Sequence, residues 1–179
     1  DKNKNIKKNI VLVSKKMKIG KKNLILMHQT HSNKVTIINN KNKNVKKIRS
    51  DAIITTIKGH GIAVVTADCV PILLYDANNL IIGCIHAGWK GAFSGIIENT
   101  IKEFKRIKPH NRIFASIGPC IGAKSYEVDL NFYKKFITRS KKNIVYFAKK
   151  NQQKKLFNLR KYVFDKLKNL NVTSDHVNY

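Results

Sequence analysis

The feature that most constrains this sequence is a change in its hydrophobic periodicity around residue 90. Before that point, apolar residues occur in short runs separated by polar or glycine-containing segments, a pattern typical of buried β-strands. After it, the apolar residues of Phe93–Ile107 share one helical face, with Lys and Glu on the other. Strands followed by helices predict an α+β or α/β domain. At 179 residues, we expect one domain spanning residues 1–179.

The same pattern sets the boundaries of the expected elements. We predict strands over the apolar runs Val11–Ser14, Asn23–Gln29, Val35–Ile38, Asp51–Thr55, Gly61–Thr66, Pro71–Asp76, Leu80–His86 and Ile113–Ile117. We predict helices over Phe93–Ile107, Val128–Ile137 and Leu156–Leu167. Residues 1–9 are charged and expected to be loose, Asn39–Lys47 is expected to be a solvated loop, and Asp76–Asn79 is expected to be a hairpin turn.

The formal net charge of +26 is extreme and could indicate a polyanion partner. The lysines, however, are scattered along the chain together with many Asn and Ile residues, a bias typical of AT-rich coding sequence. We therefore expect them to be spread over the surface, and we expect no specific nucleic-acid partner.

No apolar run reaches the ~20 residues of a membrane span, and the first residues do not resemble a secretory signal. Three irregularly spaced cysteines do not indicate a disulfide framework, so a cytoplasmic location is expected.

Three polar clusters each adjoin an apolar strand. They are His28–Val35, Thr66–Pro71 and His86–Gly91. Strand ends with small and polar residues commonly carry binding groups on a rigid scaffold. One Cys and two His from such ends would suit zinc, with a fourth position left open as in catalytic sites. The clusters contain no CxxC or HExxH motif, so the alternative is a small core cysteine with histidines that only form hydrogen bonds.

Strand geometry leaves the choice of ligands open. Because successive side chains of a strand alternate between its faces, Ile82, Cys84 and His86 share one face. His28 and His31 would point to opposite faces unless the chain bends between them. Ala-Gly after His86 would let the backbone approach a ligand closely.

The ordered motifs resemble the YfiH-like laccase-domain family, whose members are variously named multicopper polyphenol oxidase, laccase-domain or purine nucleoside phosphorylase proteins. The matching segments run from Gln29 to Val128: Gln29–Ser32 (QTHS), Asp51–Thr55 (DAIIT), Thr66–Pro71 (TADCVP), His86–Gly91 (HAGWKG), Ile117–Pro119 (IGP) and Tyr126–Val128 (YEV). The resemblance implies an α+β fold of mixed β-sheets flanked by helices, in a layered α/β sandwich.

The resemblance also implies a site and an activity. It places a Zn²⁺ ion on His31, Cys69 and His86, and makes Cys84 a packing residue. It implies phosphorolysis of purine nucleosides (adenosine, inosine or methylthioadenosine) and adenosine deamination, with nucleoside and phosphate as partners. Lys90 would orient phosphate.

Two residues that lie near the expected ligands in the sequence have further expected roles. Asp68 would transfer a proton or support a ligand, unless it only caps a turn. Trp89 would stack on a base, unless it only packs.

The sequence departs from the family pattern in four places. Ser32 replaces a common Gly, and Lys90 replaces the Arg of HAGWRG, which keeps the charge but loses the bidentate fork. The family's C-terminal segment is absent and the N-terminal opening is short, so we expect part of the pocket wall to be missing.

Other functions remain as alternatives, and the oligomeric state is left open. The older family name implies copper-dependent polyphenol oxidation, with copper in place of zinc. The six histidines are dispersed and form no HxH pair, which favours a single zinc site. Cys69 could instead be the nucleophile of an amidase, including the peptidoglycan-editing role of some relatives. A non-enzymatic, basic nucleic-acid-binding protein is the fourth alternative, but lysine faces with interleaved aromatic residues are lacking.

Overall fold

The computed structural model describes residues 2–40, 48–76, 78–109 and 112–174. In chain order, the elements are α1 (Lys2–Lys16), η1 (Lys21–Asn23), β1 (Leu24–Leu26), β2 (Val35–Ile38), β3 (Ala52–Thr55), β4 (Gly61–Ala63), β5 (Val70–Asp76), β6 (Ile81–Ala87), α2 (Trp89–Ser94), α3 (Ile96–Ile107), β7 (Phe114–Ile117), β8 (Glu127–Asp129), α4 (Leu130–Arg139), η2 (Lys141–Tyr146), β9 (Phe147–Lys149), β10 (Lys154–Phe157), α5 (Leu159–Asn169) and β11 (Thr173–Ser174).

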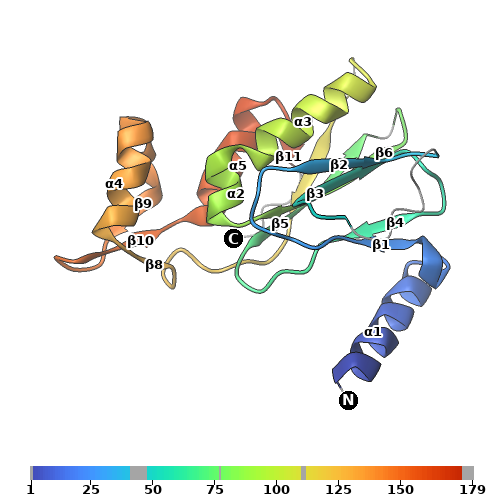
Figure 1. Cartoon of the computed structure of the whole chain (residues 1–179). Coiled ribbons are helices and arrows are strands. Elements are labelled where there is room, and N and C mark those ends of the chain that lie inside the picture. Colours follow the sequence, from blue (N-terminus) through green and yellow to red (C-terminus); the bar gives the residue numbers. More distant parts are fainter. Residues whose placement is uncertain (1, 41–47, 77, 110–111, 175–179) are drawn as a thin grey trace.

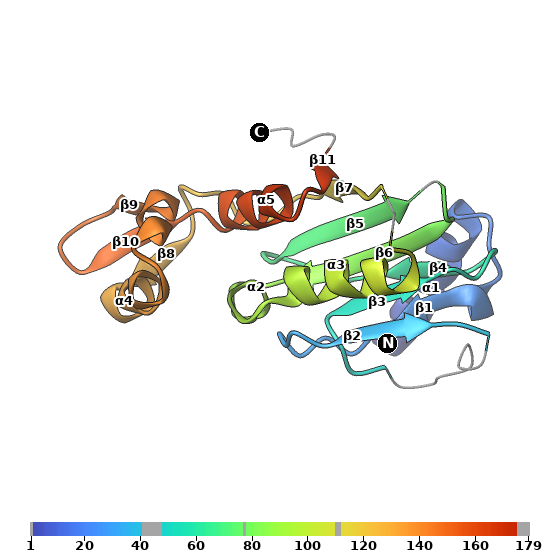
Figure 2. The same cartoon turned by 90° about the horizontal axis from the view of Figure 1, so that it is seen from above.

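A mixed six-stranded sheet in the order β11-β7-β5-β6-β3-β2 forms the centre of the fold (Figure 1). Strands β5 and β6 form an antiparallel hairpin, and β3 pairs antiparallel with β6 and parallel with β2. Helices α3 and α5 cover one face of this sheet (Figure 2). Phe104 of α3 lies on β6 at Gly83, where an added Cβ would be 2.7 Å from the ring. The close approach of helix and sheet there therefore requires glycine.

The opposite face of the sheet carries a smaller apolar cluster and a parallel strand pair. Buried Ile53, Cys84 and Ile38 pack there with Ile62 of β4, which pairs with β1. This cluster covers the second face at β3 and β6, whereas Leu73 and Tyr75 of β5 are exposed on that face. The alternation along β6 sends Cys84 to this second cluster and Ile85 to the helix side.

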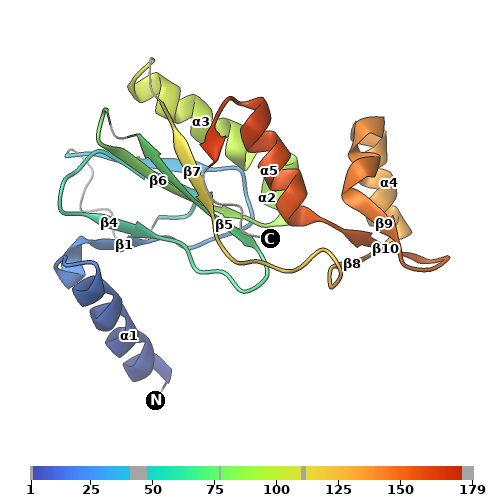
Figure 3. The same cartoon turned by 180° about the vertical axis from the view of Figure 1, so that it is seen from behind.

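A third part of the fold, made of β8, β9, β10 and α4, lies at one end beyond α2 (Figures 1 and 3). Its interior is aromatic: Phe136 stacks on Phe132 at a centroid distance of 4.8 Å and packs against Phe157 at 4.9 Å. Because Phe136 and Phe157 belong to the same buried cluster as the central sheet, this part is continuous with the main core.

The N-terminal region corrects two expectations. Residues 2–16 form helix α1, so loose structure for residues 1–9 and a strand at Val11–Ser14 were both wrong for the described residues. Lysine is a good helix former and no Gly or Pro interrupts the segment, which allows the helix to run. It extends away from the sheets (Figure 1), and Ile6 is 56% exposed.

The elements from residue 23 to residue 87 were predicted well, whereas the later helices begin at other residues than expected. The predicted Phe93–Ile107 helix is divided into α2 and α3 at Gly95, whose φ is +98°. Asp129 and Asn158 accept hydrogen bonds from Phe132 N and Lys161 N, so α4 and α5 begin after them and the preceding residues belong to β8 and β10. Residues 41–47 of the expected loop, and Ala77 of the expected turn, lie outside the described residues.

Candidate metal centre and adjoining pocket

The three polar clusters of the sequence meet at one end of the central sheet. The first follows β1, the second leads into β5, and the third ends β6. Antiparallel pairing of β5 with β6 places Pro71 opposite His86 and Val70 opposite Ala87, which brings Cys69 beside the end of β6. The sheet register thus brings together groups that are far apart in the chain.

His31, Cys69 and His86 form a compact group of potential ligands. Their ligand atoms all lie within 4.8 Å of one another, and His31 Nε2 is 3.7 Å from Cys69 Sγ. The two imidazole rings meet edge to face with centroids 4.8 Å apart. His86 is buried at 3% exposure, Cys69 is half-buried and His31 is exposed, so the group faces solvent on one side only.

The buried Asp51 connects two members of this group through hydrogen bonds. It is fully buried, and its carboxylate accepts hydrogen bonds from His86 Nδ1 (2.9 Å), His31 N (3.0 Å) and Ser32 N (2.7 Å). Burial by itself would raise the pKa of Asp51, but the hydrogen bonds from Ser32, His86 and Thr30 outweigh it and lower the pKa to about 2. Asp51 is therefore an anion near neutral pH that orients two candidate ligands at once.

The hydrogen bond from Nδ1 leaves Nε2 of His86 as the free ring nitrogen. A carboxylate–histidine pair of this kind fixes the tautomer and the ring orientation of metal-binding histidines. His31 has a φ of +57°, an unusual conformation for a non-glycine residue. The backbone hydrogen bonds from residues 30–32 to Asp51 hold the chain in that conformation.

Gly88 allows the backbone to approach this group. A Cβ added there would lie 2.7 Å from His31 Cδ2 and 2.9 Å from Cys69 Sγ, closer than real Cβ atoms come. A side chain at this point of the turn from β6 into α2 would displace the side chain of His31 or Cys69, in agreement with the close approach expected from the Ala-Gly sequence after His86.

His31 and Cys69 of this group line a pocket of about 390 Å³. The pocket is lined by Thr30, His31, Asp68, Cys69, Trp89, Lys90, Ile121, Tyr126 and Leu159. Asp68 and Lys90 are exposed, and Trp89 also packs edge to face on Phe132 at 4.8 Å. Burial raises the pKa of the Cys69 thiol, and the nearby Asp68 and Asp51 raise it further. Burial likewise raises the pKa of Tyr126 to about 12, so its hydroxyl stays protonated.

The other candidates from the sequence lie elsewhere. Cys84 is fully buried in the second apolar cluster, and burial raises its pKa to about 12. His28 is exposed and is bridged to Arg49 by parallel strand pairing. All three cysteines are free thiols. His110 and His176 lie outside the described residues.

Asp51 and Tyr126 belong to the site although sequence reasoning did not nominate them. Asp51 opens the DAIIT segment and Tyr126 opens YEV, so their place in the ordered motifs was the available signal. The partners of Asp51 lie 19–35 residues away in the chain, which no local pattern reveals.

The donor set fits a zinc ion. Nitrogen and sulfur ligands of one tetrahedral zinc ion lie roughly 3.3–3.6 Å apart, given bonds of about 2.0–2.3 Å. The 3.7 Å between His31 Nε2 and Cys69 Sγ agrees with this range. The two ligand atoms of the group that lie farthest apart, up to 4.8 Å, would have to come about 1 Å closer to bind one zinc ion. Two imidazoles and one thiolate also suit copper, so the donor set indicates a metal without choosing between the two.

The sequence model of the family described as multi-copper polyphenol oxidoreductase laccase matches residues 1–179, and the chain belongs to this family. The resemblance found in the motifs is thereby confirmed. The chain is 37% identical over 152 residues to a purine nucleoside phosphorylase of Rickettsia conorii, a match covering 83% of this chain and 61% of that protein. It is 32% identical over 151 residues to the purine nucleoside phosphorylase of Haemophilus influenzae, covering 83% and 60%. The chain thus spans about three fifths of the length of these relatives.

Solved structures support the fold. A Neisseria meningitidis protein of 27% identity superposes with a TM-score of 0.82, covering 94% of this chain and 67% of that one. The hypothetical protein YfiH of Bacillus licheniformis, at 22% identity, gives 0.83 and covers 94% and 68%. The expected α+β class, with mixed sheets flanked by helices, is confirmed.

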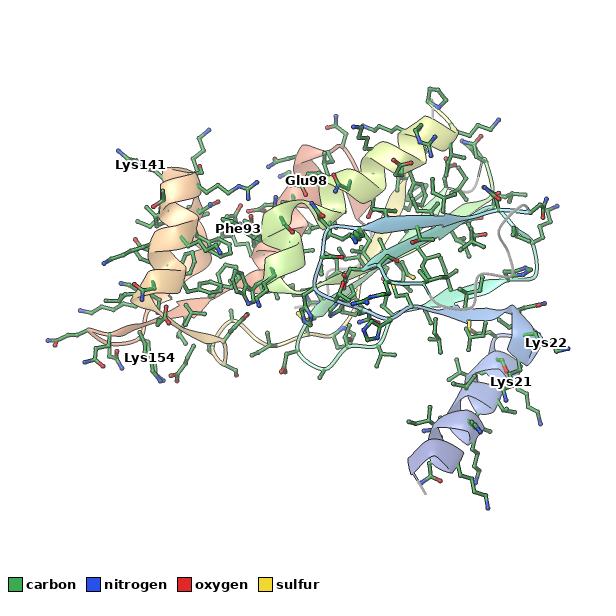
Figure 4. All side chains as sticks on the ribbon, viewed as in Figure 1. Lys21, Lys22, Phe93, Glu98, Lys141 and Lys154 are labelled. Carbon is green, nitrogen blue, oxygen red and sulfur yellow. The ribbon has the colours of Figure 1, made fainter. Side chains whose placement is uncertain are left out.

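The positive charge is distributed over distant parts of the molecule. Figure 4 shows Lys21 and Lys22 near one end, and Lys141 and Lys154 on the part that contains α4 at the other. This placement agrees with the expectation that the lysines are spread rather than focused. Among the described residues, no helix is both long and apolar enough to cross a membrane.

Proposed function

We propose that this chain forms the zinc-binding part of a purine nucleoside phosphorylase, with His31, Cys69 and His86 as the zinc ligands. The observation that carries the proposal is the convergence of these three residues in front of the buried Asp51, at the wall of a pocket. The names of the curated relatives support the nucleoside and phosphate substrates. We further propose adenosine, inosine and methylthioadenosine as nucleosides, accompanying adenosine deaminase activity, a cytoplasmic location and a single domain over residues 1–179.

The protein's own groups have distinct parts in this proposal. Asp51 keeps the proton of His86 on Nδ1 and fixes the 30–32 segment that carries His31. Zinc, once bound, would supply Lewis-acid chemistry and lower the pKa of water to about 7, providing hydroxide for deamination near neutral pH. Lys90 at the pocket edge would orient phosphate, whose oxygen attacks C1′ of the ribose as the bond to the base nitrogen breaks. The departing base takes up a proton at its nitrogen, and Asp68 would deliver that proton.

Metal analysis of the purified chain, combined with an assay of base release from adenosine, tests this proposal. We expect bound zinc and base release that depends on added phosphate. Activity that follows added copper and oxygen, with phenols as substrates and no phosphate dependence, would favour the polyphenol oxidase instead.

The Cys69→Ala variant separates zinc binding from covalent catalysis. We expect Cys69→Ala and His86→Ala each to lose metal and turnover together, because an open three-ligand site cannot lose one protein ligand and hold the ion tightly. Cys84→Ala serves as the control, since Cys84 lies in the apolar cluster and not in the site. Full zinc occupancy in Cys69→Ala would reject the assignment. Loss of turnover with unchanged metal, and trapping of the wild-type thiol by an alkylating reagent, would favour the amidase alternative.

A further inference from the structure

Two lysine ammonium groups lie against the same tryptophan at the edge of the pocket. Lys90 Nζ is 5.8 Å from the centroid of the Trp89 ring, and Lys135 Nζ is 5.3 Å from it. Both distances are within the range of cation–π attraction. Lys90 follows Trp89 in α2, whereas Lys135 comes from α4, so the fold brings the second lysine to the same ring from a separate element.

The positive charge continues along the ridge formed by Trp89 and Phe93. Lys135 Nζ is also 5.5 Å from the ring centroid of Phe93, which lies between α2 and α4 (Figure 4). One turn further along α4, Arg139 lies 4.5 Å from that ring and donates a hydrogen bond to Phe93 O. Aromatic rings and a backbone carbonyl therefore hold these cations in place, which reduces the freedom they lose on binding an anion.

In the part of the chain that the structure describes, the two lysines have no acidic counterpart. Over the described ranges, neither Lys90 nor Lys135 forms an ion pair. Asp129, the carboxylate at the start of α4, is occupied as the cap of that helix. Both ammonium groups lie against one ring without an ion-pair partner, so a bound anion would neutralise part of their charge.

We propose that Lys135 and Lys90 together bind the phosphate co-substrate at the edge of the pocket beside Trp89. The inference rests on the proposed phosphorylase function, for which it names a second phosphate-binding residue. A lone lysine is a point charge without the bidentate fork of an arginine. Inorganic phosphate carries between one and two negative charges near neutral pH, and a second lysine on α4 supplies further positive charge to balance it.

Binding of inorganic phosphate, measured by isothermal titration calorimetry without nucleoside, tests the site apart from the reaction. We compare the unmodified chain with Lys90→Gln, Lys135→Gln and the double variant. Lys134→Gln is the matched control, because it removes the same charge from the neighbouring position of α4 and lines a different hollow with Tyr133 and Ile137. We expect each single substitution in the pair to weaken phosphate binding about five- to tenfold, and the double variant to show no measurable binding. Lys134→Gln should bind as the unmodified chain does.

Equal weakening in Lys134→Gln would overturn the site, because the effect would then be one of net charge. Binding of adenosine 5′-monophosphate that depends on Lys135, with no binding of inorganic phosphate, would overturn the assignment to the co-substrate. A parallel assay of base release keeps the two proposals distinct. Phosphate-dependent base release that is unaffected by Lys135→Gln refutes the site alone, whereas Lys135-dependent phosphate binding without any base release refutes the phosphorylase function.

Discussion

Replacing the buried Asp51 by asparagine tests whether one carboxylate positions two metal ligands. Its Oδ1 accepts from His86 Nδ1 and His31 N, and its Oδ2 accepts from Ser32 N and Ser32 Oγ. In Asp51→Asn, one of these oxygens becomes an amide nitrogen that can only donate. If the amide nitrogen faces His86, the ring must accept at Nδ1 and carry its proton on Nε2, where a metal would bind. If it faces Ser32, the segment carrying His31 loses its anchor.

The structure sets the expected size of the effect. A pKa lowered from 3.8 to about 2 corresponds to about 2 kcal/mol of stability at neutral pH. A buried backbone N–H left without an acceptor costs about 1–3 kcal/mol more, so Asp51→Asn should lose about 3–5 kcal/mol in all. For a chain of this length, that corresponds to a fall in Tm of roughly 6–20 °C. Removing the hydrogen-bond partner of a ligating histidine should weaken metal binding about 10- to 100-fold.

Two measurements separate the structural effect from the effect on the site. Thermal unfolding followed by circular dichroism gives the change in Tm, and competition with a chromophoric chelator gives the zinc Kd. Asp76→Asn is the matched control, because Asp76 is also fully buried and accepts hydrogen bonds from Asn78 N and Asn79 Nδ2 at the opposite end of β5. We expect it to lower the Tm without changing the zinc Kd. A zinc Kd in Asp51→Asn equal to that of the unmodified chain would refute the positioning role.

Three further outcomes are expected. Gly88→Ala should lower metal occupancy at least tenfold, because its Cβ would lie 2.7 and 2.9 Å from atoms of two candidate ligands. Gly122→Ala should leave metal occupancy unchanged, because the space around Gly122 is open, and elemental analysis of both variants checks this. The stability that Asp51 contributes is present above pH ~4 and should be lost as pH falls towards 2, because the pKa of Asp51 is lowered in the folded state. Urea unfolding across this range should therefore show the free energies of unfolding of the unmodified chain and Asp51→Asn converging as pH falls. Nucleic-acid binding measured by fluorescence anisotropy should be weak and steeply salt-dependent, and tight, sequence-selective binding at physiological salt would contradict the spread of charge.

The hydrophobic pattern predicted the strands of the central sheet because each of the main strands contains a short apolar run between polar segments. Val35–Ile38 was predicted with the bounds that β2 has, and the β5–β6 hairpin was expected at its observed place. The apolar run was a sufficient signal both in β3, which is buried throughout, and in β5, where buried and exposed residues alternate.

The pattern failed where capping and local helix formation decide the structure. Asn158 begins α5 by accepting from Lys161 N, and the two apolar residues before it pair in β10, although they continue the helical spacing of Leu159–Leu167. The N-terminal helix was missed because its lysines and asparagines suggested solvated chain, whereas lysine also favours helix. Short polar side chains next to apolar runs therefore mark boundaries that periodicity alone misplaces.

The candidate site illustrates a different limit. The ordered motifs nominated His31, Cys69 and His86 as candidate ligands, and the structure brings these three residues together. The residue that connects two of them is Asp51, which resembles an ordinary start of a strand in the sequence. Its function depends on pairings across β3, β6 and the 30–32 segment, which only the fold brings together. Burial makes this coupling strong, since a fully enclosed carboxylate must keep all its donors or incur the desolvation cost. The tautomer of His86 and the conformation of His31 are therefore not independent: a change that releases either ligand from Asp51 leaves the carboxylate short of a donor and loosens the other. We therefore expect the candidate metal-binding group to behave as one unit anchored at the end of the sheet, with an affinity for metal that falls together with the order of the 30–32 segment.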